Sequence, residues 1–296
     1  MRAVRYRARA SPTRGSRMAE VVELVHYPVK GCAPVTAPTA RLLAAGLAHD
    51  RAFMVVTPDG VGRTQRRDPA LARVRPRVHG QEGAGELLSL RAPGAGELTV
   101  EVDTEGERRP VEMLGRPLRG IDQGDTAADW FTQVLGVPSR LVRVPPDNDR
   151  VTDGLIPGTC RYADSSAVLV VSRASLDALN ARLAARGAEP LPMSRFRPNI
   201  VVAGWEEEPH AEDRVRRLRI GPAELGYAKP AIRCAVTLVD QETGRKRGPE
   251  PLRTLAGYRR AAQGGVAFGA KFSVLRPGTL TVGDRLQVPA WGASEV

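Results

Sequence analysis

Apolar and polar residues alternate over short stretches along much of the chain, which is the pattern of half-buried β-strands. Residues 20–27 alternate in this way, have high β-propensity and end at Pro28. Residues 52–66 hold two β-rich runs joined by Pro58-Asp59-Gly60, which predicts a hairpin because these residues favour a tight turn. Further β-like runs in this half are at 71–78, 87–91, 97–102, 111–118 and 141–144. Their short lengths and Gly- and Pro-rich separators favour a barrel or sandwich.

Helical periodicity is limited to three stretches. Asp125 and Thr126 are expected to cap a helix that ends at Gly136, and Ser172 is expected to cap a second, followed by leucines on one face. Residues 250–261 predict a third helix. The other runs in the second half predict strands at 168–171, 199–203, 215–220, 232–239, 266–275 and 279–288. The pattern predicts a mainly β protein with some α-helix (α+β), in two parts.

Residues 145–160 are the expected boundary between the two parts, because this polar stretch holds three prolines and two glycines. We therefore expect a first domain at 19–144 and a second at 145–290. Residues 1–18 are expected to be a disordered leader. They carry six arginines and no acidic residue, so an organellar transit peptide is an alternative interpretation. No stretch of eighteen apolar residues exists, and we expect no membrane span.

The net charge of +11 suggests a nucleic-acid partner, but its distribution argues against one. Six of the positive charges fall in residues 1–18, which leaves +5 on residues 19–296. No dense basic run with interleaved aromatic residues occurs, and aromatic residues make up only 4% of the chain. We expect a solvated basic surface and no nucleic-acid partner.

The three cysteines, Cys32, Cys160 and Cys234, are too few and too widely spaced for a disulfide framework. This usage is typical of a reducing compartment, and we expect the protein to be cytoplasmic. No local Cys or His spacing suggests a zinc or iron–sulfur site.

Three short segments stand out chemically. Residues 27–32 present the rare Lys30 in a turn after a strand, residues 195–199 place Arg197 at the entry to a strand, and residues 230–234 place Cys234 beside Arg233. Each has a structural interpretation too: Lys30 as a solvated loop lysine, Arg197 as a surface ion pair, and Cys234 as a small buried apolar residue.

Together with other segments these residues resemble the MOSC family along nearly all of residues 20–288. The first half resembles the family's N-terminal barrel domain in 27–32, in Gly46-Leu47-Ala48-His49-Asp50-Arg51 and in Thr64-Gln65-Arg66. The second half resembles the MOSC β-barrel domain in 162–166, 175–180, 195–199, Arg233-Cys234, Phe268-Gly269 and 282–284. The most similar subgroup is that of the mitochondrial amidoxime-reducing component and its bacterial relatives.

The resemblance implies a molybdenum cofactor, Mo-molybdopterin, with Cys234 as catalytic residue and molybdenum ligand. A soft thiolate suits a metal already held by a dithiolene, and Arg233 would favour the thiolate form. It further implies cofactor-binding roles, with the cations suited to a phosphate and the hydroxyl and amide groups to directed hydrogen bonds. The residues concerned are Lys30, Gly31, Arg51, Ser165, Ser166, Arg197, Asn199, Arg233 and Lys271.

Three positions depart from the family's pattern. Gly31 and Ile232 stand where a hydroxyl residue is common in the family, and Lys271 stands where the mitochondrial members carry an aromatic residue. These departures bear on substrate and on individual cofactor contacts.

The implied reaction is reduction of small N-hydroxylated compounds such as amidoximes and hydroxylamines. The chain has neither the cysteines of an iron–sulfur cluster nor a dinucleotide-binding motif, so a separate electron donor is expected, a ferredoxin or cytochrome with its reductase. One alternative is a sulfur carrier that handles a cysteine persulfide in molybdenum-cofactor metabolism. A second alternative is a non-catalytic basic β-barrel that binds nucleic acid.

Overall fold

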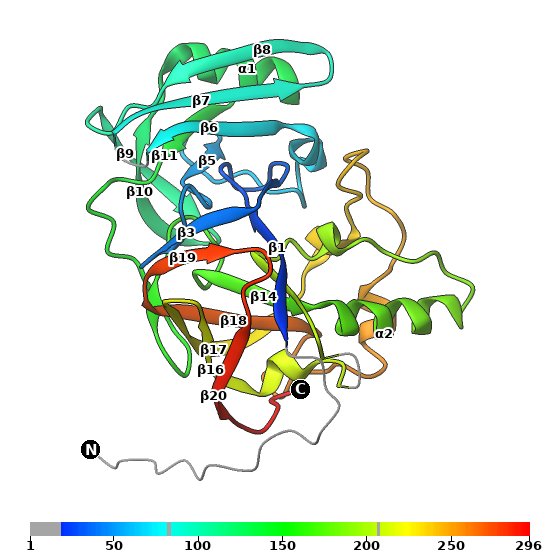
Figure 1. Cartoon of the computed structure of the whole chain (residues 1–296). Coiled ribbons are helices and arrows are strands. Elements are labelled where there is room, and N and C mark those ends of the chain that lie inside the picture. The colour runs from blue at the N-terminus through cyan, green and yellow to red at the C-terminus, as the bar shows by residue number, and fades with distance from the viewer. Residues whose placement is uncertain (1–18, 82–83, 206–207) are drawn as a thin grey trace.

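The computed structural model describes residues 19–81, 84–205 and 208–296, so the predicted leader lies outside the described residues (Figure 1). Strands dominate the described residues, and none of their helices is long and apolar enough to cross a membrane. The prediction of a mainly β fold with a few helices is confirmed. The α-helices in this part of the chain are α1 (Gly124–Leu135), α2 (Arg173–Ala184) and α3 (Leu252–Leu255).

The largest sheet has eight strands and forms the lower part of the molecule in Figure 1. Only β14 and β15 run parallel within it, and the helix α2 connects them, as a parallel pair requires. The strand order is β2 (Val35–Ala37), β1 (Glu20–His26), β15 (Ile200–Ala203), β14 (Val168–Ser172), β18 (Ala267–Arg276), β17 (Ala223–Ile232), β16 (Val215–Ile220) and β20 (Leu286–Trp291).

The upper part in Figure 1 contains two smaller sheets and α1. One has the order β5 (Phe53–Val56), β11 (Arg140–Arg143), β10 (Arg116–Asp122) and β9 (Arg108–Met113). The other has the order β6 (Arg75–Gln81), β7 (Ala84–Ala92) and β8 (Ala95–Glu101). The remaining strands are β19 (Gly278–Thr281), β3 (Thr39–Leu43) and β4 (Gly46–Leu47) in one sheet, and β12 (Val151–Thr152) and β13 (Gly158–Thr159) in another.

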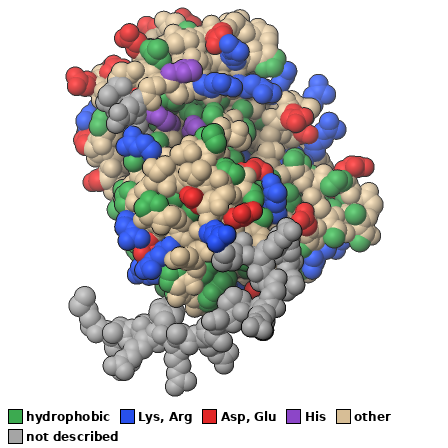
Figure 2. Space-filling view, viewed as in Figure 1, with side chains coloured by type: hydrophobic (Ala, Val, Ile, Leu, Met, Phe, Trp, Pro, Cys, Tyr) green, Lys and Arg blue, Asp and Glu red, His purple; other side chains and the backbone are tan. Residues whose placement is uncertain are grey.

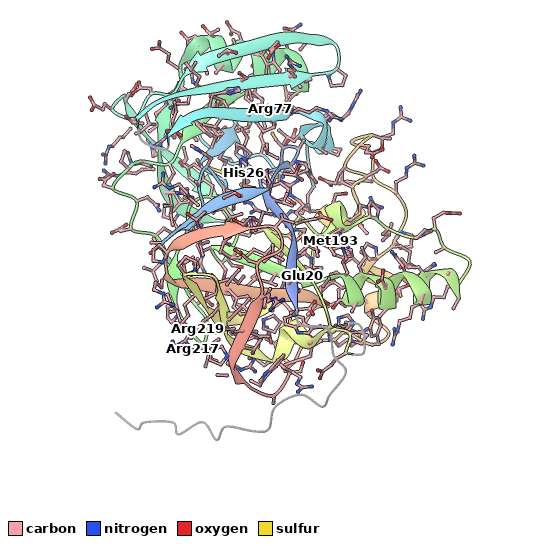
Figure 3. All side chains as sticks on the ribbon, viewed as in Figure 1. Glu20, His26, Arg77, Met193, Arg217 and Arg219 are labelled. Atoms are coloured by element: carbon pink, nitrogen blue, oxygen red, sulfur yellow. The ribbon has the colours of Figure 1, made fainter. Side chains whose placement is uncertain are left out.

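Each part has its own apolar core. Phe53, Leu88 and Phe131 belong to the upper core, whereas Leu24, Val170 and Phe272 belong to the lower one. Strand pairing nevertheless crosses the predicted boundary at residue 145, because β1 pairs with β15 and β3 pairs with β19. Figure 3 shows β1 rising from Glu20 to His26, so the segment that follows it enters the region between the two parts.

Several local predictions are confirmed. Ser172 caps α2 by accepting a hydrogen bond from Ser175 N at 3.1 Å, and Gly136 ends α1 in the left-handed conformation at φ 69°. The cap predicted at Asp125 and Thr126 is wrong, since α1 begins at Gly124 and Asp125 lies in its first turn.

Two predicted elements in the second half are also wrong. The strand predicted at 232–239 is one of them: β17 ends at Ile232, and the chain continues into a 3₁₀ helix, η4 (Ala235–Leu238). This turn is closed by the amide and the hydroxyl of Thr237, which both donate to Cys234 O. The helix expected at 250–261 is only α3, because the chain beyond it turns back and Arg260 pairs with Val266 in a β-bridge. The other 3₁₀ helices are η1 (Pro69–Arg73), η2 (Met193–Arg195) and η3 (Ala211–Arg214).

Candidate functional site

A cavity of about 380 Å³ is lined by residues from both parts of the molecule. This volume is in the range of small-molecule and cofactor sites. Every site residue predicted from the sequence lines it, although these residues extend over most of the chain. They are Lys30, Gly31, Arg51, Ser165, Ser166, Arg197, Asn199, Arg233, Cys234 and Lys271.

Two of the predicted cations lie over one aromatic ring. The guanidinium carbons of Arg51 and Arg197 are 4.3 and 4.1 Å from the centroid of the Tyr27 ring. Tyr27 is buried, and its hydroxyl donates to Pro198 O at 3.2 Å. Burial raises the pKa of Tyr27 to about 12 despite these arginines, so the ring stays neutral between them. The electron-rich ring therefore attracts both guanidinium groups.

Both arginines have left-handed backbone conformations, at φ 46° for Arg51 and φ 55° for Arg197. Such values are uncommon outside glycine and recur where a site needs a particular side-chain direction. Arg51 is further fixed by hydrogen bonds to Asp50 Oδ2 at 2.6 Å, to Asn199 Oδ1 at 3.1 Å and to Arg197 O at 3.2 Å. Burial lowers the pKa of Arg197 to about 10, which still leaves it charged at neutral pH. Arg197 is buried and has no ion-pair partner among the described residues, so its interpretation as a surface ion pair is wrong.

Asn199 bonds mainly to the protein. Its Nδ2 donates to Val25 O at 3.1 Å, and its Oδ1 accepts from Leu169 N as well as from Arg51. Asn199, which directly precedes β15, therefore connects β1 and β14 to Arg51 through hydrogen bonds. This amide positions Arg51, and only its second Nδ2 hydrogen is left for a ligand.

Lys30 is 8% exposed and donates to Tyr162 O at 2.9 Å and to Asp164 Oδ1, so its interpretation as a solvated loop lysine is wrong. Asp164 was not predicted as a site residue, although it precedes the predicted Ser165. The Asp164 side chain is 55% exposed. Its partly enclosed position at the cavity disfavours the charged form, but Lys30, Lys271 and Arg51 hold the pKa of Asp164 well below its usual range. The carboxylate is therefore ionised and holds the ammonium of Lys30 at the cavity wall.

Lys271 reaches the same wall from β18, and its Nζ donates to Ser165 Oγ at 2.5 Å. Burial, followed by the nearby Arg233, lowers the pKa of Lys271 to about 8. Ser166 is buried, and its Oγ has no hydrogen-bond partner among the described residues. Buried hydroxyl groups are normally paired, so Ser166 has an unused hydrogen bond beside the cavity.

The cysteines differ in exposure. Cys32 and Cys160 are buried, and burial raises the pKa of both thiols, that of Cys32 to about 12. Cys234 is exposed and directly precedes η4, so its interpretation as a small buried apolar residue is wrong. In the part of the chain that the structure describes, no group of three or more His, Cys, Asp or Glu residues could hold a metal ion. A metal at this cavity would have Cys234 as a single soft protein ligand.

A pair of glutamines links the two sides of the cavity and was not predicted. Gln65 Nε2 donates to Gly31 O at 2.6 Å and to Gln241 Oε1 at 3.0 Å, while Gln241 Nε2 donates back to Gln65 Oε1 at 2.9 Å. Gln241 Oε1 also accepts from Arg197 Nη1 at 3.0 Å. No sequence signal identifies this contact, because the partners are 176 residues apart.

The charge of the cavity lining defines what it can bind. Asp164 is the only carboxylate among the lining residues, and Lys30 already pairs with it. The lining cations are Lys30, Arg51, Arg66, Arg197, Arg233 and Lys271. Together with the unpaired Ser166 hydroxyl, this lining fits a phosphate-bearing, electron-rich ligand such as a pterin cofactor.

Comparison with known proteins matches both parts of the chain. Residues 18–138 match the model of the MOSC N-terminal beta barrel domain, and residues 157–287 match that of the MOSC domain. Mitochondrial amidoxime reducing component 2 of Bos taurus is 33% identical over 299 residues, which cover 93% of this chain and 86% of that protein. Mitochondrial amidoxime-reducing component 1 of Homo sapiens is also 33% identical, with the same coverage of both chains. Molybdenum cofactor sulfurase of Arabidopsis thaliana is 30% identical over 82% of this chain, but only 31% of that protein is covered.

Proposed function

The chain belongs to the MOSC family, and on that premise we propose that it is a molybdenum-cofactor-dependent oxidoreductase that reduces N-hydroxylated compounds. One observation carries the proposal: a single exposed thiol, Cys234, lines a cavity together with all the cofactor-binding residues predicted from the sequence. The similarity to amidoxime-reducing components over 93% of the chain supports the reaction type.

When bound, the cofactor would supply the two-electron redox chemistry. Cys234 would ligate its metal as a thiolate, which the exposed position allows. Arg51 and Arg197, held over Tyr27, and Arg233, held by its bond to Phe196 O at 2.8 Å, would bind the phosphate and pterin. Lys30 and Lys271 would add charge, and Ser166 would donate its free hydroxyl hydrogen.

The overall reaction takes two electrons and two protons. The N–O bond of R–NHOH breaks, the nitrogen gains a proton, and the oxygen leaves as water to give R–NH₂. The protein would keep the substrate beside Cys234, and the electrons would come from a separate redox protein. A reducing compartment such as the cytoplasm would keep the exposed Cys234 thiol free.

Elemental analysis tests the proposal most directly. Protein expressed in a molybdenum-replete host should contain one molybdenum per chain and reduce benzamidoxime when supplied with reduced methyl viologen. Cys234→Ala should abolish this activity, whereas Cys32→Ala and Cys160→Ala, at buried thiols, should retain it. Full activity of Cys234→Ala would refute the ligand assignment.

A second candidate, transfer of sulfur, is favoured by the similarity to the molybdenum cofactor sulfurase. In that case Cys234 would carry a persulfide. The purified protein would then hold cyanide-labile sulfur on Cys234 and lack N-reductase activity. The two functions therefore give opposite results in the same preparations.

A further inference from the structure

One edge of the cavity is formed by two loops from different parts of the molecule. Residues 64–73 belong to the upper part, and residues 239–247 form a turn closed by the bridge between Val239 and Lys246. The Gln65–Gln241 hydrogen bonds join the two loops. Gly244 also packs closely on the first loop, since a Cβ there would lie 3.1 Å from Arg73 Cγ and from Pro69 O. The two loops therefore form one surface.

This surface carries a concentration of exposed positive charge, which we call the basic rim: Arg66, Arg67, Arg73, Arg245, Lys246 and Arg247. Figure 2 shows basic side chains along β6 and at the upper right of the molecule, with some acidic side chains among them. Of these six residues, only Arg247 has an ion-pair partner in the part of the chain that the structure describes, Asp240, and at 4.0 Å that pair is long. The two loops also carry three carboxylates: Asp68 is paired with Arg63, Asp240 lies near Arg247, and Glu242 is exposed on the second loop.

The charges of the basic rim are not needed to build the fold. Like charges within about 10 Å repel each other at moderate ionic strength, which lowers stability. Elsewhere on the surface, exposed arginines such as Arg91, Arg108 and Arg217 have carboxylate partners at 2.7 Å. On the two loops of the rim, six cations stand against three carboxylates, one of which is paired with Arg63, so an excess of positive charge is available to an acidic partner.

The rim lies directly beside the proposed redox site. Arg66 itself lines the cavity that contains Cys234. Gln241, on the second loop, accepts a hydrogen bond from Arg197, which also lines the cavity. A protein docked on the rim would therefore lie one side chain away from the cavity wall.

We propose that the basic rim is the docking surface for a small acidic one-electron carrier that supplies this enzyme. The inference rests on the proposed function. Each docked reduced carrier would deliver one electron and leave oxidised, so two encounters and two protons from solvent reduce one N–OH group. Opposite charge accelerates such transient encounters without requiring high affinity. The rim offers no aromatic residue on which bases could stack, which favours a protein partner over single-stranded nucleic acid.

A charge reversal at the tip of the second loop tests this docking surface. Arg245→Glu combined with Lys246→Glu changes two exposed side chains that do not line the cavity. The matched control is Arg41→Glu combined with Arg285→Glu, the same change at exposed residues outside the cavity lining. Turnover of benzamidoxime is measured with an acidic [2Fe–2S] ferredoxin and its reductase, and separately with reduced methyl viologen.

The rim variant should lose about tenfold or more in kcat/KM for ferredoxin, because steering changes association rates by this order. Its viologen-driven turnover should equal that of the wild type, and the control variant should stay within about twofold in both assays. Raising the salt concentration should slow the wild type with ferredoxin and leave the rim variant nearly unaffected.

Equal ferredoxin kinetics in the rim variant and the wild type would overturn the docking surface. So would an equal loss in the control variant, or tight binding of a single-stranded oligonucleotide that only the rim variant loses. If even the wild type fails with viologen, the proposed function is wrong. Calorimetric binding of ferredoxin to wild type, rim variant and control then decides the docking surface independently of activity.

Discussion

Replacement of Tyr27 tests whether one ring holds the two cavity arginines. The guanidinium carbons of Arg51 and Arg197 are 4.3 and 4.1 Å from its centroid, and the ring is 1% exposed. A desolvated cation–π contact contributes about 0.5–2 kcal/mol, so the two contacts together contribute about 1–4 kcal/mol. Tyr27→Leu removes both contacts and leaves part of the ring volume empty.

Tyr27→Phe is the matched control, because it keeps the ring and removes only the hydroxyl that donates to Pro198 O. That single hydrogen bond is worth about 1 kcal/mol. Urea unfolding at pH 7 should therefore show Tyr27→Leu to be less stable than Tyr27→Phe by about 2–4 kcal/mol. Pterin content per chain should fall in Tyr27→Leu and stay near the wild-type level in Tyr27→Phe. Equal stability and equal pterin content in the two variants would show that the ring does not position the arginines.

Three further predictions concern the cavity, the fold and the electron supply. Lys30→Ala and Arg197→Ala should each purify folded and bind the pterin roughly ten- to a hundredfold more weakly, because a charge-assisted hydrogen bond contributes about 1.5–3 kcal/mol. A normal pterin content per chain in both variants would contradict the proposed roles of these two cations. Asp122 accepts hydrogen bonds from Arg140 at 2.6 and 2.7 Å, and, against the effect of its partial burial, these bonds lower the pKa of Asp122 to about 2. The ionised carboxylate therefore adds to the free energy of unfolding above pH 4, and this contribution is lost as the pH falls towards 2. Asp122→Asn should lower the free energy of unfolding by about 1–2 kcal/mol at pH 7, a value reduced for partial solvation, and the difference from the wild type should narrow below pH 4. The control, Asp125→Asn at an exposed carboxylate, should change the free energy of unfolding little. NADH or NADPH alone should not support benzamidoxime reduction, and turnover with a nicotinamide and no second protein would refute the need for a separate donor.

The sequence predicted both the fold class and the residues that line the cavity, but the two predictions rest on different grounds. Period-2 alternation identified β1, whereas short apolar runs identified β14 and β15, which are buried along most of their length. The ten site residues came from the resemblance to a family, and all of them line one cavity. Their individual roles stay predictions.

The errors have local physical causes. Residues 232–239 are apolar enough for a strand, but two hydrogen bonds from Thr237 to Cys234 O close a turn there, and such competition is not visible in hydrophobic periodicity. The spacing of Leu252, Leu255 and Tyr258 suggested a long helix, yet only the first turn is helical. The Gln65–Gln241 pair depends on tertiary proximity alone.

The cavity is lined by residues that are far apart in the sequence: Lys30 follows β1, whereas Lys271 lies on β18. A nascent chain emerging from the ribosome cannot complete this binding site until Lys271 has been synthesised and β18 has joined the sheet. The cofactor would therefore enter a protein whose large sheet has already formed, with β1 paired to β15 and β14 paired to β18. Because a ligand that binds only the folded state stabilises it by mass action, the supply of cofactor would then also control how much of the folded enzyme accumulates in the cell.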